Sequence, residues 1–286
     1  MKNKSFIVED LVISHRKKYS RVIERNTYHN AYEIYFLLNG CCHLFVKDKI
    51  YELEKGDLIL IKENEIHKVL YVDKSTRYER FVIYFKKSFL EGCASNIDCT
   101  EMLQDLYDRD ICQLSFDPHT IKTVKDLINQ IILEQNEKKS YFEQAINSLL
   151  LQILIIIIRF MDGYGRDKVI EESSRGDTKF EEIIQFINAN YDKNLSLDYI
   201  ADQFYISKYY LSHLFKEKSG FTVIEYINNK RIMEAQGLLN NSNYNITDIA
   251  YRVGFNNSTH FWRTFKKATG LTPSEFRKLE TTSIRD

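Results

Sequence analysis

The sequence predicts an α+β multidomain protein, with a β-barrel near its N-terminus, a helical middle region and an all-α C-terminal region. Three observations lead to this prediction. Residues 5–90 alternate between apolar and polar as strands do, the period becomes helical after Pro118, and a helical pattern repeats within residues 178–286. We expect domains at 1–118, 119–177 and 178–286. A chain of 286 residues is long enough for two or three domains.

The composition is that of ordinary globular domains, with 44% hydrophobic and 28% charged residues. The 40 basic residues equal the 40 acidic ones, which excludes a chain that binds polyanions over its whole surface. One basic region balanced by an acidic region remains compatible with this total.

Cysteine usage and the N-terminal residues favour a cytoplasmic protein. The five cysteines are an odd number at irregular spacings, so we expect reduced thiols. The first ten residues lack the apolar core of a secretory signal. The strongest apolar run, residues 149–158, is half of the about 20 residues that a membrane-spanning helix needs. We therefore expect a buried helix face and no membrane partner.

Short β-rich runs separated by turn signals predict the N-terminal barrel or sandwich. The turn pair Asn39-Gly40 and the turn Lys55-Gly56-Asp57 are two such signals. The expected strands lie at 32–38, 42–46, 50–53, 58–61, 69–72 and 80–85.

Two helices are expected in the middle region. Apolar residues follow helical spacing from Ile121 to Ile132, and a second helix starts at the capping-box pattern Ser140-x-x-Glu143 and runs to about Met161. Residues 171–177 are polar and indicate a linker. Three apolar residues of the second helix either pack against a partner in a homodimer or cover the barrel: Leu150, Leu154 and Ile157.

The C-terminal region repeats itself. Ile200-Ala201-x-x-Phe204 recurs about 50 residues later as Ile249-Ala250-x-x-Val253. Leu211-x-x-x-Phe215-Lys216-x-x-x-Gly220 recurs as Phe261-x-x-x-Phe265-Lys266-x-x-x-Gly270. Each copy predicts a helix, a tight turn and a second helix with one apolar and one polar face. This is helix-turn-helix form, in which the second helix can lie in the major groove of DNA.

Helix start signals support the same interpretation. One helix, Thr222–Leu239, is expected to join the two copies, and Ser207 and either Asn257 or Ser258 suit the N-caps of the two second helices. Three capping boxes occur at sensible intervals: Thr178-x-x-Glu181, Thr222-x-x-Glu225 and Thr272-Pro-x-Glu275.

Local charge favours a polyanionic partner for this region. Between Gln203 and Lys278 there are eleven basic and five acidic residues, an excess of the kind that phosphate contacts need. The alternative is a helical repeat that binds protein, with the basic residues on a solvated face.

The second copy is similar to the signature of AraC-type transcription regulators. The matching residues are Ile249-Ala-x-x-Val-Gly-Phe255 and Phe261-x-Arg-x-Phe-Lys-Lys-x-x-Gly-x-Thr-Pro-x-Glu-Phe-Arg277, and the resemblance covers about 180–278. It implies two helix-turn-helix subdomains that bind double-stranded DNA near promoters, RNA polymerase as a partner, and activation of transcription as the commoner outcome.

The resemblance also implies which residues contact DNA. Carried over by motif register, the positions that face bases are Tyr209, Ser212, His213, Thr259, Trp262 and Arg263. Arg263 has the clearest chemistry, because a guanidinium pairs bidentately with guanine. Trp262 either contacts DNA or packs against the connecting helix. Four lysines are phosphate contacts or solvated charge: Lys208, Lys216, Lys266 and Lys267.

The N-terminal region resembles both cupin barrels and the sensory domains of the same regulators. His29, Glu33 and His67 match ligand positions of metal-binding cupins, but a fourth position holds Thr27. The related sensory domains usually bind a small molecule without metal, so we expect neither metal nor cofactor. The complete expected fold is thus a cupin-like β-barrel, a helical dimerisation and linker region, and a double helix-turn-helix domain.

Five residues are the candidate effector contacts: His29, Glu33, His67, Tyr35 and Tyr84. The first three would hydrogen-bond a polar effector at the barrel mouth, and the tyrosines would stack on a sugar face, which makes a saccharide the first hypothesis. The structural alternative is that they are satisfied polar residues and core aromatics. A functional alternative is a cupin oxygenase or isomerase, although we expect no enzyme.

Overall fold

The computed structural model describes residues 4–8, 10–16, 29–72, 77–91, 99–107, 113–164 and 178–282. Thr27 and the expected linker at 171–177 lie outside these residues. Within them, Cys41, Cys42 and Cys99 are free thiols.

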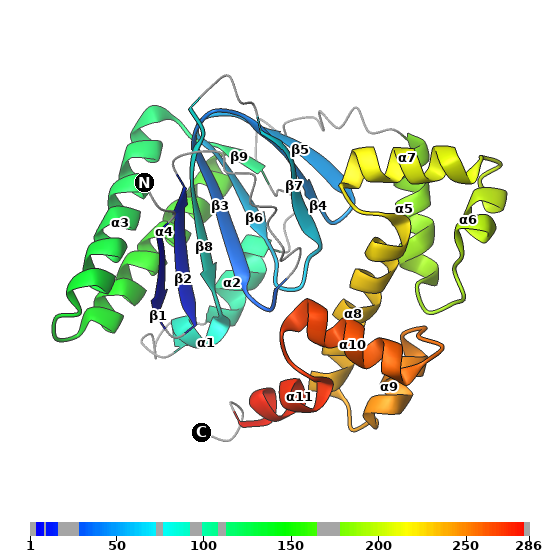
Figure 1. Cartoon of the computed structure of the whole chain (residues 1–286). Helices are drawn as coiled ribbons and strands as arrows, with labels where there is room; N and C mark the ends of the chain where they lie inside the picture. Colours follow the sequence, from blue (N-terminus) through cyan, green and yellow to red (C-terminus); the bar gives the residue numbers. More distant parts are fainter. Residues whose placement is uncertain are drawn as a thin grey trace.

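Two antiparallel sheets form the N-terminal region (Figure 1). The six-stranded sheet has the order β1-β2-β8-β3-β6-β9, and the three-stranded sheet has the order β5-β4-β7. The strands are β1 Lys4–Val8, β2 Leu11–Arg16, β3 Tyr32–Asn39, β4 Cys42–Val46, β5 Lys49–Leu53, β6 Asp57–Ile61, β7 His67–Val72, β8 Glu79–Phe85 and β9 Gln113–Ser115. All six expected strands are therefore present, and the expected cupin-like β-rich architecture is confirmed.

Alternation along β3 separates the two faces of the larger sheet. Ile34 and Phe36 pack into the core beneath the helices, whereas Tyr35 and Leu37 pack into the core between the two sheets. Because both faces are covered, seven consecutive residues of β3 are buried. The residue between Ile34 and Tyr32, Glu33, lies on the inner side with Tyr35.

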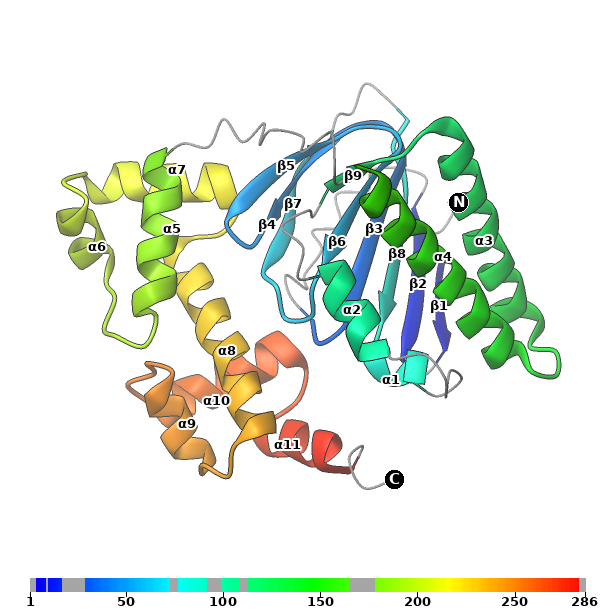
Figure 2. The same cartoon turned by 180° about the vertical axis from the view of Figure 1, so that it is seen from behind.

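Four helices cover the outer face of the larger sheet (Figure 2). They are α1 Lys87–Glu91, α2 Cys99–Tyr107, α3 Pro118–Glu137 and α4 Phe142–Tyr164. By length and composition alone α4 could span a membrane, but here it packs in an antiparallel pair with α3 against the sheet. Helix α4 begins at Phe142, one residue later than a cap at Ser140 would place it.

Leu150, Leu154 and Ile157 are fully buried within the chain. The hypothesis that these three residues pack against a partner's helix is therefore wrong, because no part of them is left for a second chain. They cover the barrel, as the alternative interpretation stated.

The C-terminal region is all helical, as expected. Its helices are α5 Thr178–Asn190, α6 Leu197–Gln203, α7 Lys208–Ser219, α8 Val223–Asn241, α9 Ile246–Arg252, α10 Ser258–Thr269 and α11 Pro273–Thr282. The pairs α6/α7 and α9/α10 are the two copies of the repeat, and α8 joins them (Figure 1). We call α6 and α7 with their neighbouring α5 the first unit, and α9, α10 and α11 the second unit.

Capping groups explain where these helices begin. Thr222 and Glu225 form the expected reciprocal capping box at the start of α8, and Thr272 and Glu275 form one at the start of α11. The third expected box differs, because Thr178 is itself the first helical residue of α5.

Candidate functional sites

Helix α7 presents one polar face because its other face is buried. Ser207 caps it by accepting from the Tyr210 amide at 3.1 Å, and Leu211, Leu214 and Phe215 pack into the core. The three expected base-facing residues all lie on the exposed face: Tyr209, Ser212 and His213. Tyr209 has 81% of its surface exposed.

Helix α10 repeats this design. Asn257 caps it by accepting from the His260 amide at 3.1 Å, and Phe261 and Phe265 are buried. The expected contacts Thr259, Trp262 and Arg263 are all exposed. Trp262 exposes 41% of its surface, so it shares the outward face with Arg263.

The four candidate phosphate-contacting lysines are also exposed. Lys208 pairs with Asp198 at 2.8 Å, and Lys216 lies 3.8 Å from Glu225. Lys266 and Lys267 lie in the last turn of α10, where the helix dipole favours positive charge.

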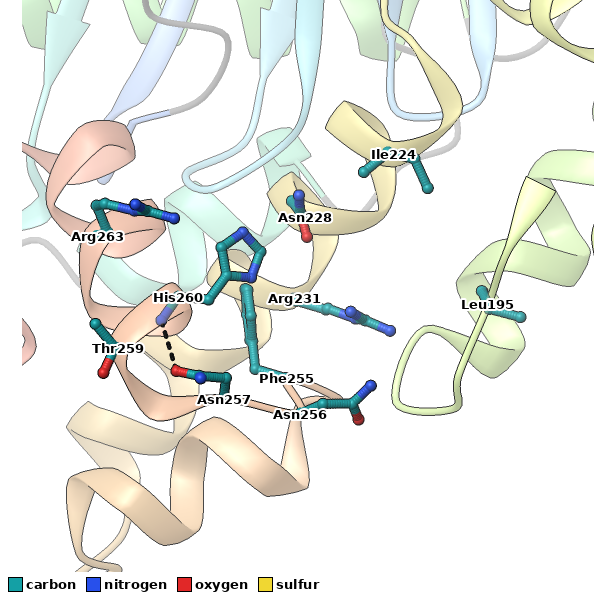
Figure 3. A pocket seen from close by; sticks show the side chains of 10 residues that line it. All are labelled: Leu195, Ile224, Asn228, Arg231, Phe255, Asn256, Asn257, Thr259, His260 and Arg263. Atoms are coloured by element: carbon teal, nitrogen blue, oxygen red, sulfur yellow. Dashed lines mark hydrogen bonds between the residues drawn. The ribbon is translucent and has the colours of Figure 1, made fainter.

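A cavity of about 480 Å³ lies between the first unit, α8 and α10 (Figure 3). Its wall includes Leu195 of the first unit, Asn228 and Arg231 of α8, and Thr259 and Arg263 of α10. Arg231 also ties α8 to the segment between α5 and α6, because its guanidinium donates to the carbonyl oxygens of Tyr191 and Lys193 at 2.7 and 2.8 Å.

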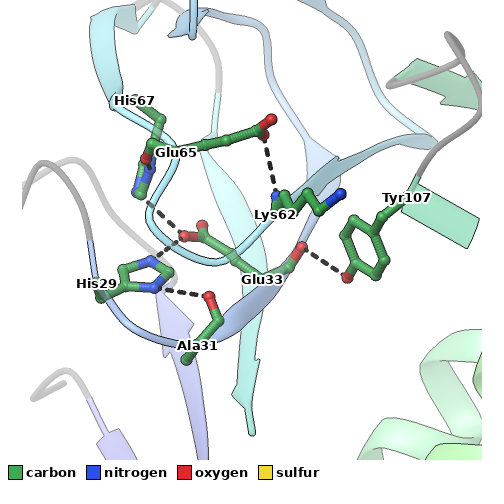
Figure 4. A network of polar contacts seen from close by, with 7 residues as sticks. All are labelled: His29, Ala31, Glu33, Lys62, Glu65, His67 and Tyr107. Atoms are coloured by element: carbon green, nitrogen blue, oxygen red, sulfur yellow. Dashed lines mark hydrogen bonds and ion pairs between the residues drawn. The ribbon is translucent and has the colours of Figure 1, made fainter. Parts of the chain in front are cut away.

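In the barrel, the structure brings His29, Glu33 and His67 together (Figure 4). The Glu33 Oε2 atom lies 2.8 Å from His29 Nε2 and 3.2 Å from His67 Nε2. Each imidazole Nδ1 faces a backbone carbonyl, that of Ala31 at 3.0 Å or that of Glu65 at 2.8 Å. Both ring nitrogens of His67 therefore face acceptors, an arrangement that favours its protonated form.

Glu33 and His67 stabilise each other's charged form. Burial raises the pKa of the Glu33 carboxyl, but the charges and hydrogen bonds of His67 and His29 outweigh it and hold this pKa at about 2. Burial lowers the pKa of His67, but the Glu33 carboxylate outweighs it and raises this pKa above its usual value. Glu33 and His67 thus form a buried ion pair below the raised pKa of His67, and His29 is partly open to solvent.

The two candidate tyrosines lie at different depths. Tyr84 is half-buried and its ring meets His29 edge-on, with 4.7 Å between centroids. Tyr35 is buried deeper, where its hydroxyl bonds to Tyr78 and the Arg80 guanidinium lies 4.7 Å from its ring. Of the two tyrosines expected to stack on a sugar, Tyr84 is thus the better placed.

Sequence reasoning missed two residues around this cluster. The Tyr107 hydroxyl donates to the Glu33 carbonyl at 3.4 Å, and no local pattern marks it, because it lies in α2, far along the chain. Arg80 could have been found from the sequence, because it is a charged residue at an inward-facing position of β8, on the same side of the strand as Val82 and Tyr84.

The same three side chains could hold a divalent cation. Their ligand atoms all lie within 4.8 Å of one another. Two imidazole nitrogens and one carboxylate suit a transition metal, and an Nδ1–H held by a carbonyl is the usual support of a ligating histidine.

Comparison with known proteins identifies both halves. The AraC-like ligand binding domain family matches residues 12–154, and a helix-turn-helix domain family matches residues 200–279. The uncharacterized HTH-type transcriptional regulator YijO of Escherichia coli K12 is 32% identical over 147 residues, which are 49% of this chain and 52% of YijO. The HTH-type transcriptional activator RhaS of Enterobacter sp. 638 is 25% identical over 166 residues, 58% of this chain and 57% of RhaS.

The chain spans about half the length of these curated relatives. Among solved structures, ToxT from Vibrio cholerae is 19% identical with a TM-score of 0.38, over 96% of this chain and 98% of ToxT. The ligand-binding family model covers half of the chain, and a helix-turn-helix model follows it. The protein belongs to the AraC family of transcription regulators, with a ligand-binding domain followed by a helix-turn-helix domain.

Proposed function

We propose that this protein is a cytoplasmic, sequence-specific DNA-binding transcription activator that responds to a small molecule bound in its barrel. The DNA-binding proposal rests mainly on one observation. All six residues expected to face bases are exposed on α7 and α10, while the main apolar residues of the same helices are buried. Such a helix can enter a major groove without unfolding.

The length of α8 supports contact with two successive grooves. Its 19 residues span about 28 Å at the rise of an α-helix. One turn of DNA measures about 34 Å. Because the two units lie at opposite ends of α8 (Figure 1), their second helices can reach neighbouring major grooves on one side of a duplex.

Activation and its partners are part of the proposal. RhaS, which this chain resembles over about half its length, is named an activator, and an activator acts on RNA polymerase. A homodimer would raise the effective concentration of the DNA-binding units on repeated sites. Leu133 of α3, which is 53% exposed, offers an apolar contact for such a dimer in place of the buried face of α4.

The effector proposed for the barrel is a small polar molecule, with a saccharide as first hypothesis. Glu33 and His67 supply charged hydrogen-bonding groups, and Tyr84 supplies an aromatic face beside His29. A thermal-shift screen of saccharides tests this, with Glu33→Gln as the variant that should lose the response.

The DNA proposal is tested by gel shift on the region upstream of the protein's own gene. Phosphate contacts release counterions, so affinity should fall steeply as salt is raised. A shift on this region that exceeds the shift on scrambled DNA supports sequence-specific binding. Absence of any salt-sensitive duplex binding would favour the rival interpretation, a helical repeat that binds protein.

A barrel enzyme is the second candidate, favoured only by the three convergent donors at His29, Glu33 and His67. An oxygenase or isomerase of this kind would need a metal held there. Metal analysis of the purified protein distinguishes the two, because absence of stoichiometric metal removes the enzyme candidate.

A further inference from the structure

The barrel contributes side chains to the core of the first unit. Phe45 of β4 is fully buried, and its ring lies 6.3, 6.1 and 6.3 Å from the rings of Phe180, Phe221 and Tyr226. Further residues of the smaller sheet join this core. We call these barrel residues the docking face: Phe45, Ile50, Ile66, Lys68 and Leu70.

Polar contacts fix the docking face against the end of α7. The Lys68 ammonium donates to the Gly220 carbonyl at 2.6 Å and lies 4.4 Å from the ring centre of Phe221. The Tyr226 hydroxyl donates to the Lys47 carbonyl at 3.1 Å. Gly220 is the left-handed cap of α7, so the barrel touches the helix that we propose reads DNA.

The equivalent position of the second unit has different surroundings. A Cβ at Gly220 would lie 2.9 Å from Leu70 and 3.0 Å from Lys68. Gly270 caps α10 in the same left-handed conformation, but a Cβ there would meet nothing within 4 Å. The apolar core of the second unit, as far as the described residues show, is built from Tyr191 and residues after it.

Three consecutive residues connect the docking face to the polar cluster formed by His29, Glu33 and His67. Ile66 lies in the core of the first unit, His67 pairs with Glu33, and Lys68 holds the end of α7. A change that moves His67 therefore acts on both neighbours through the backbone at the start of β7.

We propose that the barrel controls the first helix-turn-helix unit alone. The docking face holds the end of α7 in place, and the His29–Glu33–His67 cluster determines, through Ile66 and Lys68, how firmly it is held. The second unit reads DNA independently of the barrel. This inference rests on the proposed function, and it names which unit is regulated and through which contact. An effector acts here by binding the docked and undocked states with different affinity.

Amide hydrogen exchange on the full chain tests this without DNA or effector. Lys68→Met keeps the alkyl stem but removes the ammonium, so exchange at 216–221 should rise about tenfold, with 266–271 unchanged. Lys55→Met, at an exposed lysine in a barrel turn away from the docking face, is the matched control and should change neither segment. An equal rise in both segments, or no rise at 216–221, overturns the docking role of Lys68.

A second pair of variants tests the link to the polar cluster. Glu33→Gln should also raise exchange at 216–221 selectively. Leu103→Ala opens a cavity on the opposite face of the larger sheet and controls for general loss of barrel stability. If Leu103→Ala raises exchange at 216–221 as much as Glu33→Gln does, the link through β7 is overturned. Failure of the gel shift would remove the DNA proposal and leave these exchange results intact.

Discussion

The two helix-turn-helix units share one local design but have different surroundings. Each second helix starts at a side-chain cap, buries two or more apolar residues and ends at a left-handed glycine. The first unit, however, shares its core with the barrel through Phe45 and Ile66, whereas the second packs on α8. The difference shows that a sequence repeat preserves local structure while its two copies can take different roles.

Loss of packing in the core that the barrel shares with the first unit should give the largest effect on stability. Phe45→Ala should lower the free energy of unfolding by about 3–5 kcal/mol, because it leaves a cavity where three aromatic rings meet. Hydrogen exchange should rise in both the barrel strands and the first unit. Phe265→Ala, its counterpart control in the second unit, should raise exchange in that unit only. Identical exchange patterns for the two variants would show that the units do not differ as described.

Breaking the buried Glu33–His67 ion pair should give the second-largest effect on stability. Glu33→Gln should cost about 3 kcal/mol at pH 5–6, because it leaves a buried imidazolium without its counter-charge. The pKa of Glu33 is lowered to about 2, so its contribution is present above about pH 4.5 and is lost as the pH falls toward 2. The pKa of His67 is raised, so its contribution is full below about pH 6.5 and is lost as the pH rises through the folded-state value.

Urea denaturation of both proteins from pH 3 to pH 9 measures this dependence. The other titratable groups facing the pair are His29, Glu65, Tyr84 and Tyr107. Since these are common to both proteins, the difference between wild type and variant isolates Glu33. A difference that stays constant over the whole range would contradict the coupling between Glu33 and His67.

DNA contacts should give a smaller and more specific effect. Arg263→Ala should cost about 1–3 kcal/mol of binding free energy and relax base preference at one position. Lys267→Ala should weaken binding to all sequences alike and reduce the salt slope by about 1. Gel shifts with base-substituted and random duplexes measure both, and Lys122→Ala on α3 is an exposed control. Equal losses on specific and random DNA for Arg263→Ala would rule out base reading.

The smallest effects should come from the helix caps. Ser207→Ala and Asn257→Ala should each lower local stability by about 1 kcal/mol, because each leaves a helix N–H without its side-chain acceptor. Hydrogen exchange in the first turns of α7 and α10 measures this. Similar losses in the two helices would locate the difference between the units in the barrel contact. A much larger loss at α10 would instead place it in the helices themselves.

Local patterns were sufficient to predict much of this molecule. Strand alternation, turn residues and capping boxes depend on neighbours a few residues away, so they identified β3–β8, the repeat and the start of α8. The buried and exposed sides of α7 and α10 followed from helical spacing for the same reason. Such patterns also selected His29, Glu33 and His67 as a group, although through their resemblance to known barrels.

Contacts between distant residues required the folded chain. Phe45 looks like an ordinary barrel residue in β4, and nothing near it in sequence indicates that its ring lies among Phe180, Phe221 and Tyr226. Lys68 and Gly220 are 152 residues apart. Leu150 fits a dimer face or a core equally well by periodicity, and only packing against the sheet decided between them. Periodicity tells which side of an element is apolar, but the partner of that side depends on how all the elements pack.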